Sequence, residues 1–229
     1  MGEAAMTQQK QLIKKGAEAS LYLANWHGRQ VVIKMRLPKQ YRPEQLDLTI
    51  RRYRTVHEPQ LMHEAKRAGV STPTIFLVDV ENATVVMEYV AGQQVKQMLD
   101  TTSDASRHQL CVDIGTLIGK LHSHGVIHGD LTTSNMILTE AGRVFLVDFG
   151  LGEKNVELEA RGVDLHLFRR ALQSTHFQVA DACFWAVLEG YEAVLGADGT
   201  ARVLDKIREI EKRGRYIADR QQEAEQVGM

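Results

Sequence analysis

The chain has little of what marks several large classes of protein. Among its 229 residues there are four prolines and two cysteines, and the formal net charge at pH 7 is −1. So few prolines, together with 44% hydrophobic residues, exclude a collagen-like or largely disordered chain. A net charge this close to zero gives no field over the whole molecule that would attract nucleic acid or a membrane surface. The composition is that of a globular protein.

Paired cysteines and long apolar runs are missing as well. Cys111 and Cys183 lie far apart, in apolar helix-like segments, which predicts buried, reduced thiols and a cytoplasmic location. No apolar run approaches the about 20 residues that cross a bilayer. The first residues, MGEAAMTQQKQ, also lack the layout of a signal peptide. We therefore expect a protein that has no membrane partner.

Apolar periodicity divides the chain into a strand-rich part and a helical part. Two pairs of strands are expected at 20–35 and 74–90, with a helix between them that stops at Gly69. Short strands and long helical patterns follow, and the patterns cover 106–125, 157–174, 180–195 and 201–213. This order predicts an α+β bilobal fold, with an N-terminal lobe at 1–90 and a C-terminal lobe at 91–229. A cleft between two such lobes is a common place for a binding site.

The stretch HGDLTTSN at 128–135 has the chemistry of a phosphoryl-transfer site. Such a site needs a cation on the phosphates of ATP, oxygen ligands for magnesium, and a carboxylate beside the attacking group. Protein kinases use a loop H-R-D-x-x-x-x-N followed by D-F-G. Asp130, Asn135 and Asp148 stand at the corresponding positions here. Each alone is compatible with an ordinary turn, but this order, beside expected strands, indicates a kinase-type site.

With these motifs the chain resembles the small atypical kinases of the KEOPS complex, whose eukaryotic members are called PRPK. The resemblance is carried by HGDLTTSN with DFG, by KKGAEAS and VIKMR, and by RYRTVHE followed by KRAGV. It extends from about Lys14 to Arg215, nearly the whole chain. It implies a protein kinase-like fold and a phosphotransferase that acts as a Ser/Thr kinase, an ATP hydrolase, or both.

The resemblance also implies a role for each matching residue. Lys34 would hold the α- and β-phosphates and pair with a helix glutamate, which by alignment of TVHE is Glu58, with Glu64 as the alternative. Pro59 speaks against Glu58, because proline is disruptive inside a helix. Asp130 would be the catalytic base. The remaining contacts with Mg-ATP would come from Gly16 and Ala17 in the phosphate loop, Met87, Glu88 and Val90 at the connector, and the metal ligands Asn135 and Asp148.

Several positions depart from ordinary kinases. Only Gly16 remains of the glycine-rich loop, Gly129 replaces an arginine that reads a phosphate on the activation loop, and Thr132 replaces a lysine. Asp164, expected to brace the catalytic loop, follows Asp148 without an A-P-E signature between them. So short a segment leaves little room for the platform that binds a peptide substrate.

Basic residues gather in two places. Residues 31–54 contain seven Lys or Arg against two acidic residues, and the tail around Arg213 and Arg215 is also basic. Either group could contact RNA phosphates or simply face solvent. In the family the basic tail folds back towards the ATP cleft, whereas the polar residues beyond Arg215 are typical of disorder. The histidines at 122–128 lack the partners of a metal site.

Three functions remain open. The first is an ATP- and magnesium-dependent KEOPS enzyme that works with the threonylcarbamoyl-transferring subunit, other KEOPS subunits and tRNA. The second is a stand-alone Ser/Thr protein kinase whose protein substrate is unrelated to tRNA. The third, a non-catalytic regulatory subunit, is disfavoured by the full set of Lys34, Asp130, Asn135 and Asp148. The missing peptide platform favours the first function over the second, and whether ATP is hydrolysed or its phosphate transferred stays open.

Overall fold

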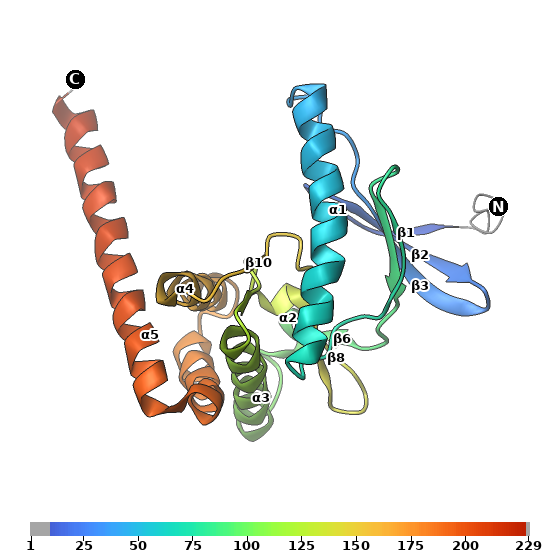
Figure 1. Ribbon diagram of the computed structural model, residues 1–229. Helices are drawn as coiled ribbons and strands as arrows, with labels where there is room; N and C mark the ends of the chain where they lie inside the picture. Colours follow the sequence, from blue (N-terminus) through green and yellow to red (C-terminus); the bar gives the residue numbers. More distant parts are fainter. Residues whose placement is uncertain (1–9, 228–229) are drawn as a thin grey trace.

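The structure consists of a small lobe built on a β-sheet and a larger helical lobe (Figure 1). It is a computed structural model that describes residues 10–227, with side chains as far as residue 213. The sheet is antiparallel, and its strands in spatial order are β1 (Gln11–Lys15), β2 (Ser20–Trp26), β3 (Arg29–Met35), β5 (Thr84–Glu88) and β4 (Ile75–Asp79). A strand-rich lobe followed by a helical one confirms the predicted α+β class.

Two tight turns set the pairing of the sheet. His27 and Gly28 join β2 to β3 with φ angles of 50° and 78°, the left-handed conformation that two-residue hairpin turns require. Asn25 supports this turn, because its Oδ1 accepts a hydrogen bond from the Gly28 amide. Ala83, with φ 48°, forms part of the turn between β4 and β5. The sequence predicts both hairpins but misses β1, whose residues are all exposed and show no alternation.

Helix α1 (Glu44–Arg67) lies against the sheet (Figure 1). It ends before Gly69, which has φ 79° and is the predicted stop. Pro59 lies inside the helix, so the expectation that it would disrupt one was wrong. A proline costs a helix interior about 3 kcal/mol. Burial of Leu61 and Met62 in the main core, at about 2 kcal/mol each, offsets that cost.

The helical lobe is organised around α3 (Asp104–Ser123) and α5 (Ala180–Val227). Two helical segments meet in α5 at a kink at Gly196, where φ is 74°, which agrees with the two separate patterns in the sequence. The other elements of this lobe are α2 (Val95–Met98), the 3-10 turn η1 (Thr133–Asn135), α4 (Leu158–Thr175), β6 (Gln93–Gln94), β7 (Val126–Ile127), β8 (Met136–Leu138), β9 (Val144–Leu146) and β10 (Glu153–Lys154). The chain crosses between the lobes after β5, at residues 89–92.

The thiols of both cysteines are buried in the helical lobe. Cys111 lies on α3 and Cys183 on α5, and neither is in a disulfide, as predicted. Among residues 10–227 no helix is both long and apolar enough to span a bilayer.

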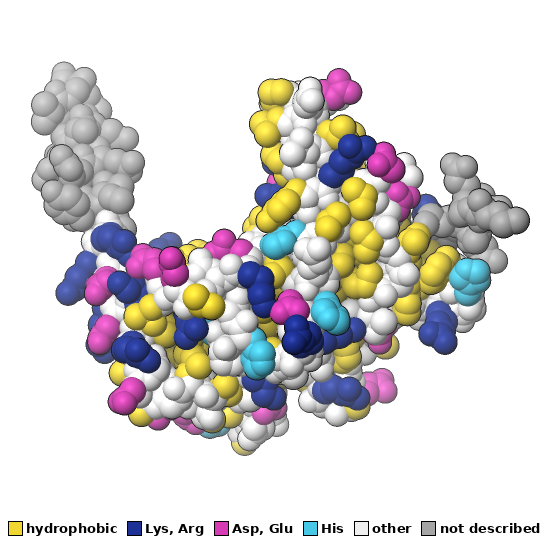
Figure 2. All heavy atoms as spheres, in the orientation of Figure 1, with side chains coloured by type: hydrophobic (Ala, Val, Ile, Leu, Met, Phe, Trp, Pro, Cys, Tyr) yellow, Lys and Arg dark blue, Asp and Glu magenta, His cyan; other side chains and the backbone are white. Residues whose placement is uncertain are grey.

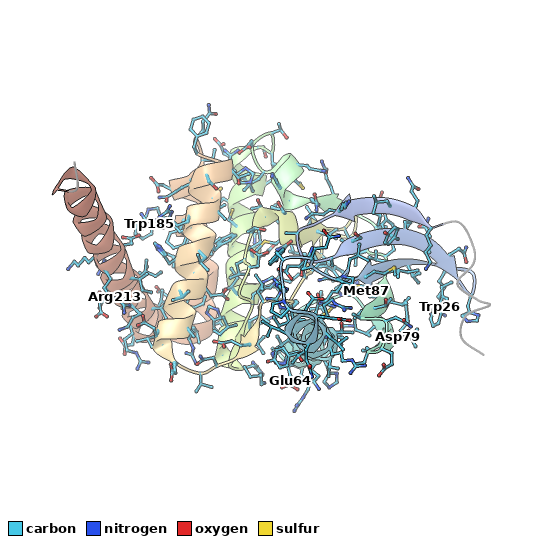
Figure 3. All side chains as sticks on the ribbon, turned by 90° about the horizontal axis from the view of Figure 1, so that it is seen from above. Trp26, Glu64, Asp79, Met87, Trp185 and Arg213 are labelled. Atoms are coloured by element: carbon cyan, nitrogen blue, oxygen red, sulfur yellow. The ribbon has the colours of Figure 1, made fainter. Side chains whose placement is uncertain are left out.

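The end of the chain differs from expectation in two ways. Helix α5 continues to Val227, so the prediction of disorder beyond Arg215 was wrong. Arg213 binds Glu159 at the start of α4, on the opposite side of the molecule from the sheet (Figure 3). The basic tail therefore does not fold back towards the cleft. Residues 216–227 favour a helix because Gln, Glu and Ala dominate their composition.

Glycine permits the close crossing of α3 and α5. A Cβ on Gly115 would lie 1.8 Å from the carbonyl oxygen of Val187, and a Cβ on Gly190 would lie 1.9 Å from that of Val112. The obstacle is main chain in both cases, so a rotamer change cannot relieve it.

We expect Gly115→Ala to lower the free energy of unfolding by about 3 kcal/mol or more, because the helices must move apart. The matched control is Gly199→Ala in α5, where the added methyl would meet only Leu195 Cβ, at 3.2 Å. That change should be neutral or raise stability by up to about 1 kcal/mol through helix propensity. Urea denaturation of both variants checks this, and equal stabilities would contradict the close contact.

Candidate active site between the two lobes

A cavity of about 260 Å³ opens where the β1–β2 loop, β3 and the HGDLTTSN loop meet. Glu18, Arg36 and Arg54 line it together with several residues singled out from the sequence. These are Gly16, Ala17, Lys34, Asp130 and Asp148. Segments more than 100 residues apart in the chain thus share one wall.

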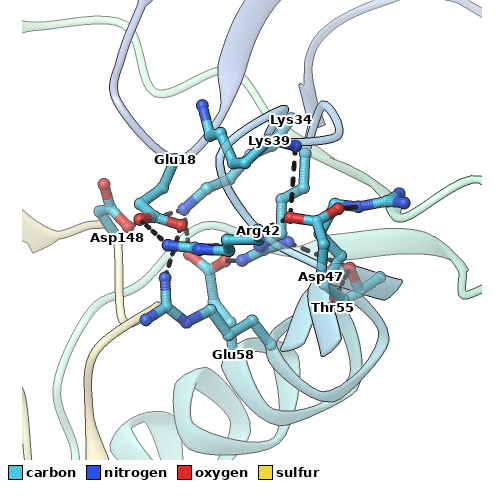
Figure 4. A network of polar contacts seen from close by, with 11 residues as sticks. Glu18, Lys34, Lys39, Arg42, Asp47, Thr55, Glu58 and Asp148 are labelled. Carbon is cyan, nitrogen blue, oxygen red and sulfur yellow. Dashed lines mark hydrogen bonds and ion pairs between the residues drawn. The ribbon is translucent and has the colours of Figure 1, made fainter. Parts of the chain in front are cut away.

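Lys34 lies at the centre of a network of buried charges (Figure 4). Its Nζ is 2.7 Å from Oε1 of Glu58 and 2.6 Å from Oδ1 of Asp148. Arg36 binds the other oxygen of Glu58 and donates a second hydrogen bond to Thr55 at 3.3 Å. Glu58 is 1% exposed, so both of its oxygens are satisfied by cations rather than by water.

Attraction between opposite charges fixes the protonation of this network. Burial lowers the pKa of Lys34, but the carboxylates of Glu58 and Asp148 outweigh it, and the pKa is raised overall. Burial raises the pKa of Asp148, but the charge of Lys34 outweighs it, and that pKa is lowered. Both side chains are therefore charged at neutral pH, as a phosphate-binding lysine and a metal-binding carboxylate must be.

The geometry separates the two candidate glutamates. Six residues along a helix correspond to about 600° of rotation, which places Glu64 well round the helix from Glu58. Glu64 instead binds Lys154 at 2.7 Å between Oε2 and Nζ, on the surface. Lys34 pairs with Glu58 although Pro59 follows it.

Asp148 is held in an uncommon backbone conformation. Its φ of 65° lies in the left-handed region, which costs a non-glycine residue about 1 kcal/mol or more. Strain of this kind persists where the surroundings impose it, and it occurs preferentially at functional sites. Here it accompanies the contact between Asp148 and Lys34, while the carboxylate remains about half exposed to the cavity.

Asn135 and Asp130 are linked directly. Nδ2 of Asn135 donates to the backbone oxygen and to Oδ2 of Asp130, at 2.9 Å each. Amide and carboxylate oxygens suit magnesium, which commonly binds one or two protein groups and completes its shell with phosphate and water. Asn135 and Asp148 fit that pattern. Among the described residues no cluster of three or more His, Cys, Asp or Glu suggests another metal.

Asp164 braces the start of the loop. It is 1% exposed, and its two oxygens accept hydrogen bonds from the backbone amides of His128 and Gly129 at 2.9 Å each. His122 adds a contact to Asp164 at 3.1 Å. Burial lowers the pKa of His128, which is therefore neutral at pH 7 and lies against the ring of Phe149.

Gly129 explains one departure from ordinary kinases. Its φ is 79°, and a Cβ there would lie 2.2 Å from the carbonyl oxygen of Leu151. The segment after DFG passes so close to the loop that no side chain fits, an arginine least of all.

The expected adenine contacts lie outside the cavity lining. Met87 is buried, and the amide of Glu88 donates to the carbonyl of Thr74 at 2.8 Å. Val90 lies in the connector between the lobes and is buried as well. Their role with adenine stays a prediction.

Glu18 is a site residue that the sequence did not reveal. Its carboxylate oxygens bind Arg42 at 3.1 Å and Arg54 at 2.7 Å, and it lines the cavity beside Lys34. A single glutamate in a loop carries no motif. Glu18 belongs to the site because the fold places its loop beside Arg54 of α1.

The basic stretch at 31–54 is largely neutralised in the fold. Six of its seven cations form ion pairs, namely Lys34, Arg36, Arg42, Arg51, Arg52 and Arg54. Most of the acidic partners come from outside the stretch, so a count of charges along the sequence overstates the patch. Figure 2 likewise shows Lys and Arg interleaved with Asp and Glu over the helical lobe.

Comparisons with known proteins agree with this geometry. The protein kinase domain family matches residues 7–167. A KEOPS complex subunit Bud32 of Pyrococcus abyssi is 46% identical over 211 residues, which cover 90% of this chain and 96% of that protein. A probable bifunctional tRNA threonylcarbamoyladenosine biosynthesis protein of Methanothermobacter thermautotrophicus is 44% identical, and the match covers 93% of this chain but only 38% of that longer protein.

Among solved structures, the Rio2 kinase of Chaetomium thermophilum matches with a TM-score of 0.58 and 20% identity, over 91% of this chain and 75% of that one. At this identity the likeness shows the fold alone. It confirms the predicted protein kinase-like fold.

We expect Glu58→Gln to lower the free energy of unfolding by about 3 kcal/mol or more, because it leaves two buried cations without their shared carboxylate. Glu64→Gln is the matched control on the same helix, and loss of its exposed pair should change stability by less than about 1 kcal/mol. Urea denaturation at neutral pH measures both. If the two variants lose equal stability, the buried network does not hold α1 in place.

Proposed function

Because this chain belongs to the protein kinase domain family, and within it to the family of the KEOPS subunit Bud32, we propose that it is an ATP- and magnesium-dependent enzyme of the KEOPS complex. It would act as an ATP hydrolase or Ser/Thr kinase in support of threonylcarbamoyladenosine formation in tRNA, in the cytoplasm. One observation carries the proposal: Lys34, Asp130 and Asp148 converge on one cavity, with Lys34 fixed between Glu58 and Asp148.

Each residue has a task that its position supports. Lys34 holds the α- and β-phosphates, while the amides around Gly16 and Ala17 cover them. Asp130 accepts the proton of the attacking hydroxyl group or water. Asn135 and Asp148 would hold magnesium, which would supply positive charge beside the transferred phosphoryl group. Met87, Glu88 and Val90 would surround the adenine.

The segment after DFG supports ATP hydrolysis within a complex over a stand-alone protein kinase. It forms β10, which pairs with β7 directly in front of the catalytic loop, and α4 begins at Leu158. A Cβ on Gly152 would lie 2.7 Å from the carbonyl of Ile127, so the segment is packed against the loop. The residues between DFG and α4 are too few to form the platform on which ordinary protein kinases bind a peptide.

The partners are inferred from the relatives. We propose the threonylcarbamoyl-transferring subunit and other KEOPS subunits as protein partners, and tRNA as the nucleic acid of the assembled complex. Direct contact of tRNA with residues 31–54 has weaker support, because most cations there are already paired.

The test follows the labelled γ-phosphate of ATP in purified protein, with and without the threonylcarbamoyl-transferring subunit and tRNA. Label released as free phosphate, and increased by both additions, would support the proposal. Label found chiefly on a protein and indifferent to tRNA would instead indicate the stand-alone kinase.

We expect Asp148→Asn to lower magnesium-dependent ATP turnover by at least about 100-fold, the loss typical when a group that stabilises transition-state charge is removed. Asp113→Asn, an exposed change on α3, is the control and should keep full turnover. The measurement is the steady-state rate at saturating ATP. Unchanged turnover in Asp148→Asn would show that Asp148 is not a metal ligand.

We expect Glu18→Gln to tighten ATP binding by about 3-fold or more without changing adenosine binding, because it removes a negative charge from the cavity and releases Arg42 and Arg54. Glu81→Gln frees Arg52 outside the cavity and serves as the control. Calorimetric titration with both ligands measures the difference. Weaker ATP binding in Glu18→Gln would mean that the carboxylate organises the loop rather than opposes the phosphates.

A further inference from the structure

A series of three hydrogen-bonded side chains, two of them buried, reaches the HGDLTTSN loop from the helical lobe. Oγ1 of Thr133 lies 2.9 Å from Nε2 of His176, and Nδ1 of His176 lies 2.8 Å from Oδ1 of Asp100. Thr133 and His176 are 3% and 1% exposed, so water cannot replace either partner. These hydrogen bonds link three elements: Thr133 lies in η1, His176 ends α4, and Asp100 lies in the turn after α2.

The direction of each hydrogen bond follows from the groups involved. The carboxylate of Asp100 accepts only, so Nδ1 of His176 carries the proton that faces it. In a ring that carries only this proton, Nε2 is an acceptor and receives the hydroxyl proton of Thr133. Asp100 is about half exposed, so its charge stays partly solvated while it orients the ring.

The series ends at the part of the loop that determines metal binding. Thr133 lies between Asp130 and Asn135 in sequence, and η1 is closed by a hydrogen bond from the Asn135 amide to the carbonyl of Thr132 at 3.0 Å. Asp164 fixes only the start of the loop, at residues 128–129. The second half is held by other contacts. The amide of Val147 donates to the carbonyl of Asn135 at 2.9 Å, and Nε2 of Gln94 donates to the carbonyl of Ser134 at 3.0 Å. Thr133 adds the side-chain link to His176 in the helical lobe.

We propose that His176, oriented by Asp100, is a positioning residue that anchors Thr133 and thereby holds Asn135 and Asp130 in place for a magnesium-bound nucleotide. The inference rests on the proposed function. The competing explanation is a histidine that stabilises the lobe and has no effect on the site.

The experiment measures ADP binding to the full chain by calorimetry, with and without magnesium. Thr133→Val keeps the shape of the side chain but removes the hydroxyl, and His176→Phe keeps a ring but removes both nitrogens. In each variant we expect magnesium to improve ADP binding about 10-fold less than in the wild type, a loss at the lower end for outer partners of a metal site. Binding of metal-free ADP should stay within about 2-fold, since Thr133, His176 and Asp100 do not line the cavity and reach it only through the loop.

Thr133→Ser is the conservative variant and should restore the effect of magnesium, because it returns the hydroxyl. Asp100→Ala, a change at a half-exposed residue, should act in the same direction as His176→Phe but more weakly. The matched control is Thr116→Val, which removes a hydroxyl that donates to the carbonyls of Val112 and Gly190 where α3 meets α5, outside the loop. It should leave the effect of magnesium unchanged.

The outcomes separate the explanations. If Thr133→Val and His176→Phe lose stability but keep the wild-type effect of magnesium, the role is structural and the proposal is wrong. If Thr133→Ser behaves like Thr133→Val, the hydroxyl is not the anchor, which also overturns it. Should His176→Phe not fold, the comparison of Thr133→Val with Thr133→Ser still decides. If wild-type protein shows no effect of magnesium on ADP, the proposed function itself fails.

Discussion

The buried carboxylate of Glu58 is the constraint on which the arrangement of the two lobes depends. It is shared by Lys34 and Arg36, and these two cations with one anion would leave a net positive charge in a nearly dry environment. The fourth group, Asp148, comes from the other lobe and balances the charges. Buried ion pairs add little net stability compared with apolar packing, but an unbalanced one is strongly unfavourable. The network therefore selects the geometry in which β3, α1 and the DFG segment meet.

A second constraint is the close approach of the DFG segment to the catalytic loop. The amide of Gly129 donates to Asp164, and the carbonyl of Leu151 lies where a side chain on Gly129 would have to begin. The absence of an arginine before Asp130 is thus a consequence of packing and not merely the loss of a regulatory group. Because the chain turns back this early after DFG, residues 151–154 pack directly against the start of the catalytic loop.

Motifs and periodicity predicted the parts of the structure that are encoded locally. The two hairpins and the stop of α1 at Gly69 follow from turn residues and apolar spacing. The assignment of Lys34 and Asp148 to one site came from the resemblance carried by VIKMR, HGDLTTSN and DFG, and their direct contact was not predicted. Features that depend on pairing over long distances were missed. Glu18 became a site residue only through Arg42 and Arg54, and His176 only through Asp100 and Thr133.

The wrong expectation for Pro59 and the overestimated charge of the basic stretch have the same origin. The local cost of Pro59 predicted a break in the helix, but burial of Leu61 and Met62 in the core stabilises α1 across it. The basic stretch was counted along the chain, although Glu18, Glu58 and Glu81 neutralise much of it in space. Charge and propensity summed along a sequence describe the unfolded chain better than the folded one.

The charges of the cavity also indicate how it would accept a polyphosphate. Lys34 and Arg54 already hold the carboxylates of Asp148 and Glu18, so an arriving phosphate exchanges one anionic partner for another. Such an exchange gains less free energy than binding to unpaired cations, because the existing pair must first be broken. A phosphate on Lys34 would release Asp148 from its partner and leave an uncompensated carboxylate beside it. A divalent cation at Asp148 would remove that penalty, so nucleotide and metal would favour each other's binding by a shared free energy. The ion pair between Lys34 and Asp148 would therefore couple the proposed binding of the nucleotide to that of the metal.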